Sequence, residues 1–175
     1  MRMLRLVGDR IILRDQIADD LDAMHQWLAD PETSRFLTWA TRSKEETLLH
    51  LAEGIGEQLK EDRRKYYLTI VLKDEGPVIG DTGIEVKKRG PGGGEGEIGY
   101  FLIKPYWGQG YATEAARLVI AYGFSQLGLH RIKNKFSLRL FYFPQMLLYR
   151  ESGHRHRAMN NNIFPSSGKH LFLSS

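Results

Sequence analysis

The stretch of sequence that decides the fold runs from residue 103 to residue 114. It reads Ile103-Lys104-Pro105-Tyr106-Trp107-Gly108-Gln109-Gly110-Tyr111-Ala112-Thr113-Glu114. This pattern indicates a strand that ends in a glycine-containing turn and continues directly into a helix. The first N–H groups of a helix lack partners within it, so such a turn can bind a phosphate or pyrophosphate. A second interpretation stays open here, in which the glycines only shape a strand-to-helix turn.

Hydrophobic patterning on both sides of the turn predicts alternating strands and helices. Strands are predicted at residues 6–14, 66–72, 78–86, 97–103 and 131–136. Residues 73–77 are of types that favour a turn between the strands at 66–72 and 78–86, which predicts a hairpin. Residues 87–96 contain five glycines and a proline, and we expect a mobile loop there.

Three helices are predicted between these strands. A short one carries apolar residues at helical spacing behind Asp19 and Asp20 and ends at Asp30-Pro31. The second begins at Ser43 with a capping-box pattern and runs to about Lys60. Its predicted inner face consists of Leu48, Ala52, Ile55 and Leu59. The third follows the glycine-containing turn, and its inner face is made of small residues, which permits close packing on a sheet.

Composition limits the classes of protein to consider. The chain has 175 residues, which predicts a single domain, and 42% of them are hydrophobic, as in a soluble globular protein. It has no cysteine, which excludes disulfides, thiolate-bound zinc, iron–sulfur clusters and a cysteine nucleophile. No apolar run is long enough to span a membrane, and no signal sequence is evident, so we expect a cytoplasmic protein without a membrane partner.

Positive charge is concentrated in the last quarter of the chain. Residues 130–175 hold eight lysines and arginines against one acid, Glu151, whereas the remaining 129 residues carry a net charge of −3. Such asymmetry indicates either an arm that binds a polyanion or a tail of foreign composition.

Two further patterns in the sequence have some features of a binding site. Gly94, Gly96 and Gly99 match the dinucleotide-binding fingerprint literally, but they precede a strand and do not open a helix, so we expect a loop. The six histidines show no metal-ligand spacing, and His154 and His156 have no neighbouring carboxylate, so no metal is assigned.

Several segments together resemble one known family, the GNAT N-acetyltransferases, in the branch related to ribosomal-protein N-terminal acetyltransferases. The resemblance covers roughly residues 4 to 133. The segments that carry it are residues 9–14, the Asp30-Pro31 pair, residues 43–47, residues 96–100, residues 106–115 and residues 129–132.

The resemblance implies that acetyl-coenzyme A binds at the strand-to-helix turn. Its pyrophosphate would contact the backbone N–H groups of Gln109, Gly110, Tyr111, Ala112 and Thr113. Trp107 stands where the family usually has Arg or Gln, and Gly108 follows it. Backbone groups near Phe101, Leu102 and Ile103 would pair with the pantetheine arm and polarise the thioester carbonyl.

The resemblance also implies direct attack of an amine on the thioester, which needs a base and an acid. Glu97 is the candidate base, acting directly or through water; its alternative is an exposed strand glutamate. Tyr149 is the candidate acid; its alternative is a core aromatic residue, because the surrounding sequence matches the family poorly, with His154 in place of a phenylalanine.

The expected fold is α/β (α+β): one GNAT-like domain over residues 1–175, with a mixed, largely antiparallel twisted sheet flanked by helices. Residues 134–175 are expected to be atypical. They would leave an exposed sheet edge that favours a homodimer or aggregation.

The expected activity is acetyl transfer from acetyl-coenzyme A to a primary amine, either a small molecule or a protein N-terminus such as that of a ribosomal protein. Nucleic acid is not an expected partner of this enzyme. Two alternatives stay open: a non-catalytic protein that binds acyl-coenzyme A, and a ribosome- or RNA-binding module that uses the basic C-terminal segment.

Overall fold

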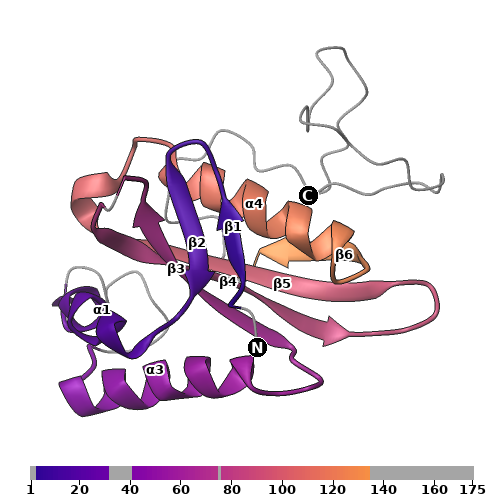
Figure 1. The fold of residues 1–175 in the computed structure, drawn as a ribbon, viewed down its shortest axis with the longest axis horizontal. Helices are drawn as coiled ribbons and strands as arrows, with labels where there is room; N and C mark the ends of the chain where they lie inside the picture. Colours follow the sequence, from indigo (N-terminus) through magenta and orange to yellow (C-terminus); the bar gives the residue numbers. More distant parts are fainter. Residues whose placement is uncertain (1–2, 32–40, 75, 135–175) are drawn as a thin grey trace.

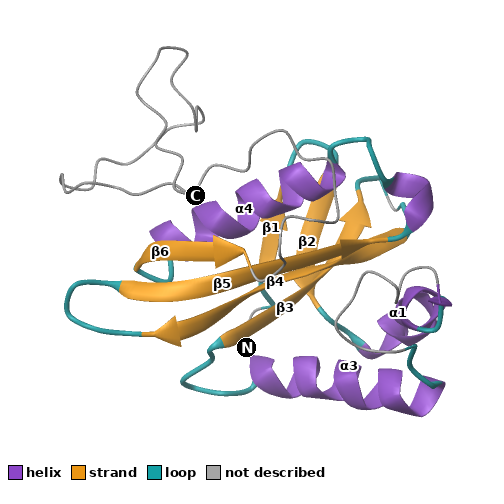
Figure 2. Ribbon diagram, turned by 180° about the vertical axis from the view of Figure 1, so that it is seen from behind, coloured by secondary structure: helices purple, strands orange, loops and turns teal. Residues whose placement is uncertain are grey.

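The computed structural model describes residues 3–31, 41–74 and 76–134. These residues form a six-stranded sheet in the order β1-β2-β3-β4-β5-β6, with helices on both faces (Figures 1 and 2). All neighbouring strands are antiparallel except β5 and β6, which run parallel because α4 connects them. The expected α/β fold, a mixed and largely antiparallel sheet flanked by helices, is confirmed.

The N-terminal part of the sheet is a hairpin and not the single strand predicted at residues 6–14. β1 (Arg5–Val7) and β2 (Ile11–Asp15) pair antiparallel around a tight turn, in which the N–H of Gly8 donates to the carbonyl of Ile11 at 2.9 Å. The polar residues Asp9 and Arg10 lie in this turn. The prediction joined two short strands because their apolar residues follow one another so closely.

The middle of the sheet consists of β3 (Lys65–Leu72), β4 (Val78–Lys88) and β5 (Gly94–Leu102). The predicted hairpin between β3 and β4 is confirmed. The loop predicted at residues 87–96 is shorter than expected, because strand pairing continues into the glycine-rich segment up to Lys88 opposite Glu95, with an irregularity after Val86.

Helix α4 (Tyr111–Ser125) covers one face of the sheet and leads into β6 (Leu129–Asn134). Its small inner face is confirmed, since Ala112, Ala115, Ala116, Val119 and Gly123 are buried. A Cβ atom on Gly123 would lie 2.7 Å from the Ile132 side chain and 2.8 Å from that of Ile84. The helix therefore packs close to the sheet, over the larger hydrophobic core.

Helices α1 (Leu21–Leu28) and α3 (Lys44–Gln58) lie on the opposite face (Figure 2). Ser43 caps α3 through the predicted capping box. The predicted inner face of α3 is confirmed only for Ile55, which packs against the smaller hydrophobic core. Leu48 and Leu59 are 51% and 73% exposed, whereas Thr47, Leu51 and Gly54 are buried. The helix therefore packs against α1 and the sheet with a side that combines Leu51 with small and polar residues, and not with the side that carries Leu48 and Leu59.

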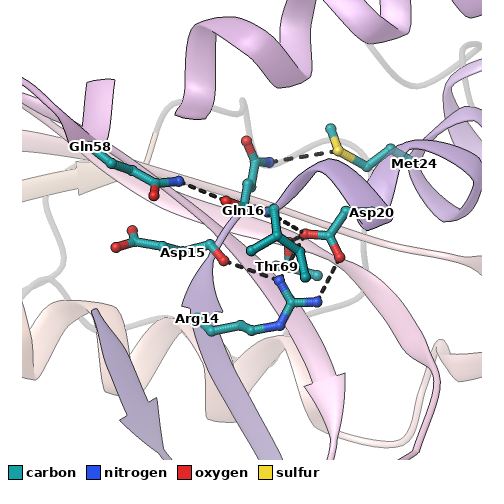
Figure 3. Close-up of polar contacts among 8 residues, drawn as sticks. Arg14, Asp15, Gln16, Asp20, Met24, Gln58 and Thr69 are labelled. Carbon is teal, nitrogen blue, oxygen red and sulfur yellow. Dashed lines mark hydrogen bonds and ion pairs between the residues drawn. The ribbon is translucent and has the colours of Figure 1, made fainter. Parts of the chain in front are cut away.

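A buried carboxylate joins α1 to the sheet (Figure 3). Asp20, at the start of α1 and 1% exposed, accepts two hydrogen bonds from the Arg14 guanidinium at 2.6 and 2.8 Å and one from the Thr69 hydroxyl at 2.7 Å. The N–H of Ile17 donates to the same carboxylate at 3.0 Å. Burial alone would raise the pKa of Asp20, but these hydrogen bonds outweigh it and hold the pKa below its ordinary value.

We predict that Asp20→Asn lowers the free energy of unfolding by about 3 kcal/mol at neutral pH, because Arg14 loses its buried counter-ion. A carboxylate with a lowered pKa in the folded state stabilises the fold above its unfolded pKa of about 3.9, and this stabilisation is lost as the pH falls further. Urea unfolding between pH 3 and pH 8 should therefore show a constant deficit above about pH 5 that shrinks below pH 4.

The matched control is Asp19→Asn, which changes an exposed neighbour in the same turn. It should alter the free energy of unfolding by less than about 0.5 kcal/mol. Equal stability of the two variants across the pH range would contradict the anchoring role of Asp20.

Candidate functional site

The turn before α4 has the geometry of an anion site. Gly108 and Gly110 have φ angles of +73° and +84°, in the left-handed region that favours glycine. Gly110 is the N-cap of α4. Within the described part of the chain, the backbone N–H groups of residues 108–113 donate to no backbone acceptor. Their hydrogen-bonding capacity and the helix dipole therefore remain available to a phosphate group.

Glu114 and Arg10 hold this turn in place. The Glu114 carboxylate, 14% exposed, accepts from the backbone N–H of Arg10 at 2.8 Å, from Arg10 Nε at 3.0 Å and from the N–H of Ile11 at 3.3 Å. Burial raises the pKa of Glu114, but these donors outweigh it and the pKa is lowered. Arg10 Nη1 also donates to the Gln109 carbonyl at 2.9 Å, and its guanidinium lies 4.5 Å from the centre of the Tyr111 ring.

β5 leads to the turn, and beyond Ile98 no described strand pairs with its outer side; we call this part of β5 the open edge. β5 pairs with β6 as far as Ile98 opposite Asn134, where the described residues of β6 end. The N–H of Ile103 donates to the Ile79 carbonyl at 3.0 Å, and backbone groups in an antiparallel pair alternate in direction. Those of Phe101 and Ile103 therefore face β4, and those of Leu102 face the open edge. Trp107 Nε1 donates to the Leu102 carbonyl at 2.5 Å, which ties the turn to the strand end.

A cavity of about 380 Å³ lies on the other face of the sheet, beneath α1 and α3. We call it the acidic cavity. Its charged or titratable lining residues are Arg42, His50, Glu53, Lys65, Tyr66, Tyr67, Asp81, Glu85, Glu97 and Tyr100. Trp27 and Phe101 form part of its wall, with ring centres 5.9 Å apart.

Glu97, the predicted base, does line this cavity. Its carboxylate lies 3.4 Å from Lys87 Nζ, and the same ammonium group lies 2.7 Å from Glu85. The pKa of Lys87 is raised by these two carboxylates, Glu85 first. Glu97 is therefore a partly neutralised carboxylate at the cavity wall.

The acidic cavity also contains a carboxylate that the sequence analysis missed, Asp81. It lies on β4 directly opposite Phe101 of β5. Burial raises the pKa of Asp81 to about 7, and the positive charge of Arg42 opposes this only in part. Nothing in the local sequence marks Asp81, because its burial arises from helices that cover the sheet from elsewhere in the chain.

The predicted acid, Tyr149, lies outside the described residues, as does the atypical segment from residue 135 onward with its expected effects on dimerisation. Among residues 3–31, 41–74 and 76–134, no group of three or more histidines and carboxylates could hold a metal ion. In the same ranges, no helix is both long and apolar enough to cross a bilayer.

The chain is similar to known acetyltransferases in sequence and in fold. A family model described as the acetyltransferase (GNAT) domain matches residues 10–137. The chain is 30% identical over 133 residues to the uncharacterized N-acetyltransferase p20 of Bacillus licheniformis, a match that covers 76% of this chain and 73% of that protein.

Two solved structures share the fold. One is RimL, a ribosomal L7/L12 alpha-N-protein acetyltransferase, with a TM-score of 0.60 at 19% identity, covering 75% of this chain and 71% of that one. The other is the microcin C7 self-immunity acetyltransferase MccE, solved in complex with acetyl-CoA and AMP, with a TM-score of 0.61 at 16% identity, covering 76% and 73%. At these identities the likeness is one of fold.

We predict that Gly110→Asp weakens coenzyme A binding at least 100-fold. The substitution places a carboxylate among the N–H groups of the turn, where it would repel a pyrophosphate, and forces a non-glycine residue into the left-handed region. Isothermal titration calorimetry on the folded variant measures this loss.

Two controls separate charge from strain. Gly110→Ala introduces the strain alone and should weaken binding less than the aspartate. Gly92→Asp adds the same charge in an exposed loop, where a Cβ atom meets nothing within 4 Å, and should bind as the unaltered protein does. Unaltered affinity of Gly110→Asp would remove the turn from the cofactor site.

Proposed function

Because the chain belongs to the acetyltransferase (GNAT) domain family, we propose that it is an enzyme that transfers an acetyl group from acetyl-coenzyme A to a primary amine. One observation carries the proposal. Residues 108–113 present unpaired N–H groups at the start of α4, beside the open edge of β5 and across the sheet from the acidic cavity. The arrangement offers one site for a pyrophosphate and another for a cationic acceptor.

The residues of the turn fit acetyl-coenzyme A. The N–H groups of residues 109–113 would hold the pyrophosphate, with Arg10 supplying a positive charge beside Gly110. Leu102 has its N–H on the open edge, where it would donate to the pantetheine arm or to the thioester carbonyl. Trp107 would keep this strand end and the turn at a fixed separation.

Acetyl-coenzyme A supplies the acetyl thioester in this reaction. A new bond forms between the acceptor nitrogen and the acetyl carbon, and the carbon–sulfur bond breaks. An acceptor ammonium loses two protons overall: one ends on the coenzyme A thiol and the other leaves through a base of the protein. The chain therefore has to bind an ammonium group, remove a proton from it and align the free amine with the thioester.

The acidic cavity supports a cationic acceptor. Four carboxylates line it, from Glu53, Asp81, Glu85 and Glu97, against the cations Arg42 and Lys65. The pKa of His50 is lowered by burial first and by Arg42 second, so the imidazole is neutral at neutral pH. A protein N-terminus, as in RimL, and a small-molecule amine both carry the charge that this lining favours.

A screen of amines with acetyl-coenzyme A tests the proposal. We expect thiol release that depends on the amine, detected with a thiol reagent, and a mass increase of the acceptor by one acetyl group. Tight binding of acetyl-coenzyme A without amine-dependent thiol release would contradict the enzymatic function and favour a binding protein.

For Glu97 we propose a supporting role, in which it attracts the acceptor ammonium and passes a proton through water. We predict that Glu97→Gln raises the KM of a cationic acceptor by threefold to tenfold, about the effect of one unit charge at 4 Å in water, and leaves coenzyme A affinity unchanged. Steady-state kinetics and calorimetry measure the two quantities.

The matched control is Glu95→Gln, on the same strand but outside the cavity lining. It should leave KM as it is. A loss of 100-fold or more in kcat for Glu97→Gln would instead make Glu97 the base itself.

A further inference from the structure

We propose that Asp81 is the catalytic base, and that it takes the proton from the acceptor amine at the end of the acidic cavity nearest the thioester. This inference rests on the proposed function and assigns a residue to its proton-transfer step. Four observations carry it: the register of two strands, the ion pairs of the other carboxylates, the covering of the cavity and the charges around Asp81.

The strand register places Asp81 next to the reacting end of β5. Asp81 is the cross-strand partner of Phe101, so the two Cα atoms are about 5.5 Å apart and both side chains lie on the same face. Leu102, which follows Phe101, has its backbone groups on the open edge. Glu97 precedes Phe101 by four residues, or about 13 Å along the strand. Asp81 is therefore much nearer to the expected thioester than Glu97 is.

Asp81 is also the carboxylate of the cavity that forms no ion pair with a described residue. Glu53 pairs with Lys65 at 2.7 Å, and Lys87 contacts both Glu85 and Glu97. A carboxylate held by a lysine is a weaker proton acceptor, because the ion pair stabilises its charged form. Asp81 lines the cavity as a partly buried residue.

The elements around Asp81 keep it poorly solvated. Trp27 of α1 stacks on Phe101, and this pair belongs to the smaller hydrophobic core formed by α1, α3 and the sheet. Burial of this kind disfavours the charged carboxylate and raises its pKa, which makes it a better proton acceptor when it is ionised.

Several charged or titratable groups line the same cavity as Asp81. They are Arg42 before α3, His50 and Glu53 of α3, Lys65, Tyr66 and Tyr67 of β3, Glu85 of β4, and Glu97 and Tyr100 of β5. The positive charge of Arg42 opposes part of the effect of burial. Of the others, Glu53 and Lys65 neutralise each other, and Lys87 offsets the two glutamates of β4 and β5. Burial therefore remains the dominant influence on Asp81.

In the proposed step, the ionised Asp81 carboxylate accepts one proton from the acceptor ammonium. The freed nitrogen lone pair forms the bond to the acetyl carbon. When the carbon–sulfur bond breaks, its electron pair stays on sulfur, which takes up the second proton lost from nitrogen. Asp81 then releases its proton to water through the cavity, and the protein returns to its starting state.

The experiment compares two isosteric variants, Asp81→Asn and Glu97→Gln, using the acceptor that gives the highest turnover in the amine screen. We expect Asp81→Asn to lower kcat by 10² to 10⁴, the usual contribution of a positioned base, with unchanged calorimetric affinity for coenzyme A. The unaltered protein should show a rise of kcat/KM with pH centred near 7, and Asp81→Asn should lack it. Glu97→Gln should retain this rise.

A second measurement reads the carboxyl group directly, without turnover. In protein labelled with carbon-13 at the aspartate carboxyls, one resonance that is missing from Asp81→Asn should titrate near pH 7. Titration of that resonance near pH 4 would overturn the inference.

The kinetic outcomes distinguish the inference from the function on which it rests. If the unaltered protein is active and Asp81→Asn keeps its kcat and its pH profile, Asp81 is not the base and the proposed function stands. If no amine supports thiol release by the unaltered protein, the proposed function itself fails. A larger loss in Glu97→Gln than in Asp81→Asn would return the base to Glu97.

Discussion

The carboxylate of Glu114 accepts three hydrogen bonds from Arg10 and Ile11, and thereby fastens the first turn of α4 to the first hairpin of the sheet. This contact joins residues more than 100 positions apart in the chain. It fixes where α4 begins, while Arg10 holds the Gln109 carbonyl on the outside of the turn. The N–H groups of residues 108–113 are then directed away from the protein's own acceptors, as an anion site requires. The site and the packing of α4 on the sheet depend on the same anchor.

Much of this arrangement could be predicted from the sequence, because the signals were local. The turn at Gly108 and Gly110, the small inner face of α4 and the capping box at Ser43 all follow from residues within a few positions of one another. The predictions failed where tertiary contacts decide. The spacing of Leu48 and Leu59 predicts that they lie on the buried face of α3. In the structure the helix buries Thr47 and Gly54 instead, because those residues fit against α1 and the sheet. The same reason explains why Arg10 and Asp81 were overlooked: each gains its role from partners that are distant in sequence.

The sheet separates two electrostatic environments that an acetyl transfer needs at the same time. On the side of α4, a helix N-terminus and Arg10 favour a negatively charged cofactor. On the side of α1 and α3, a cavity whose charged lining holds more carboxylates than cations favours a cationic acceptor. The open edge of β5 at Leu102 is where the two sides meet, because the backbone there points toward the edge and Asp81 lies beside the preceding residue. The negatively charged cofactor and the cationic acceptor would thus approach the same point from opposite sides of the sheet, each attracted by its own set of charges.

Burial acts on the carboxylates of both Asp20 and Asp81, but the two side chains differ in the hydrogen bonds that they accept. Asp20 accepts four hydrogen bonds, so its pKa is lowered and its charge joins α1 to the sheet. Asp81 accepts no such hydrogen bond from a described residue, and the positive charge of Arg42 opposes the effect of burial only in part, so its pKa rises. A carboxylate whose burial is compensated only in part destabilises the folded state, and such groups are found mainly at functional sites, where a perturbed pKa is useful. Because the two aspartates differ in this way, we assign a stabilising role to Asp20 and the proton-transfer role to Asp81.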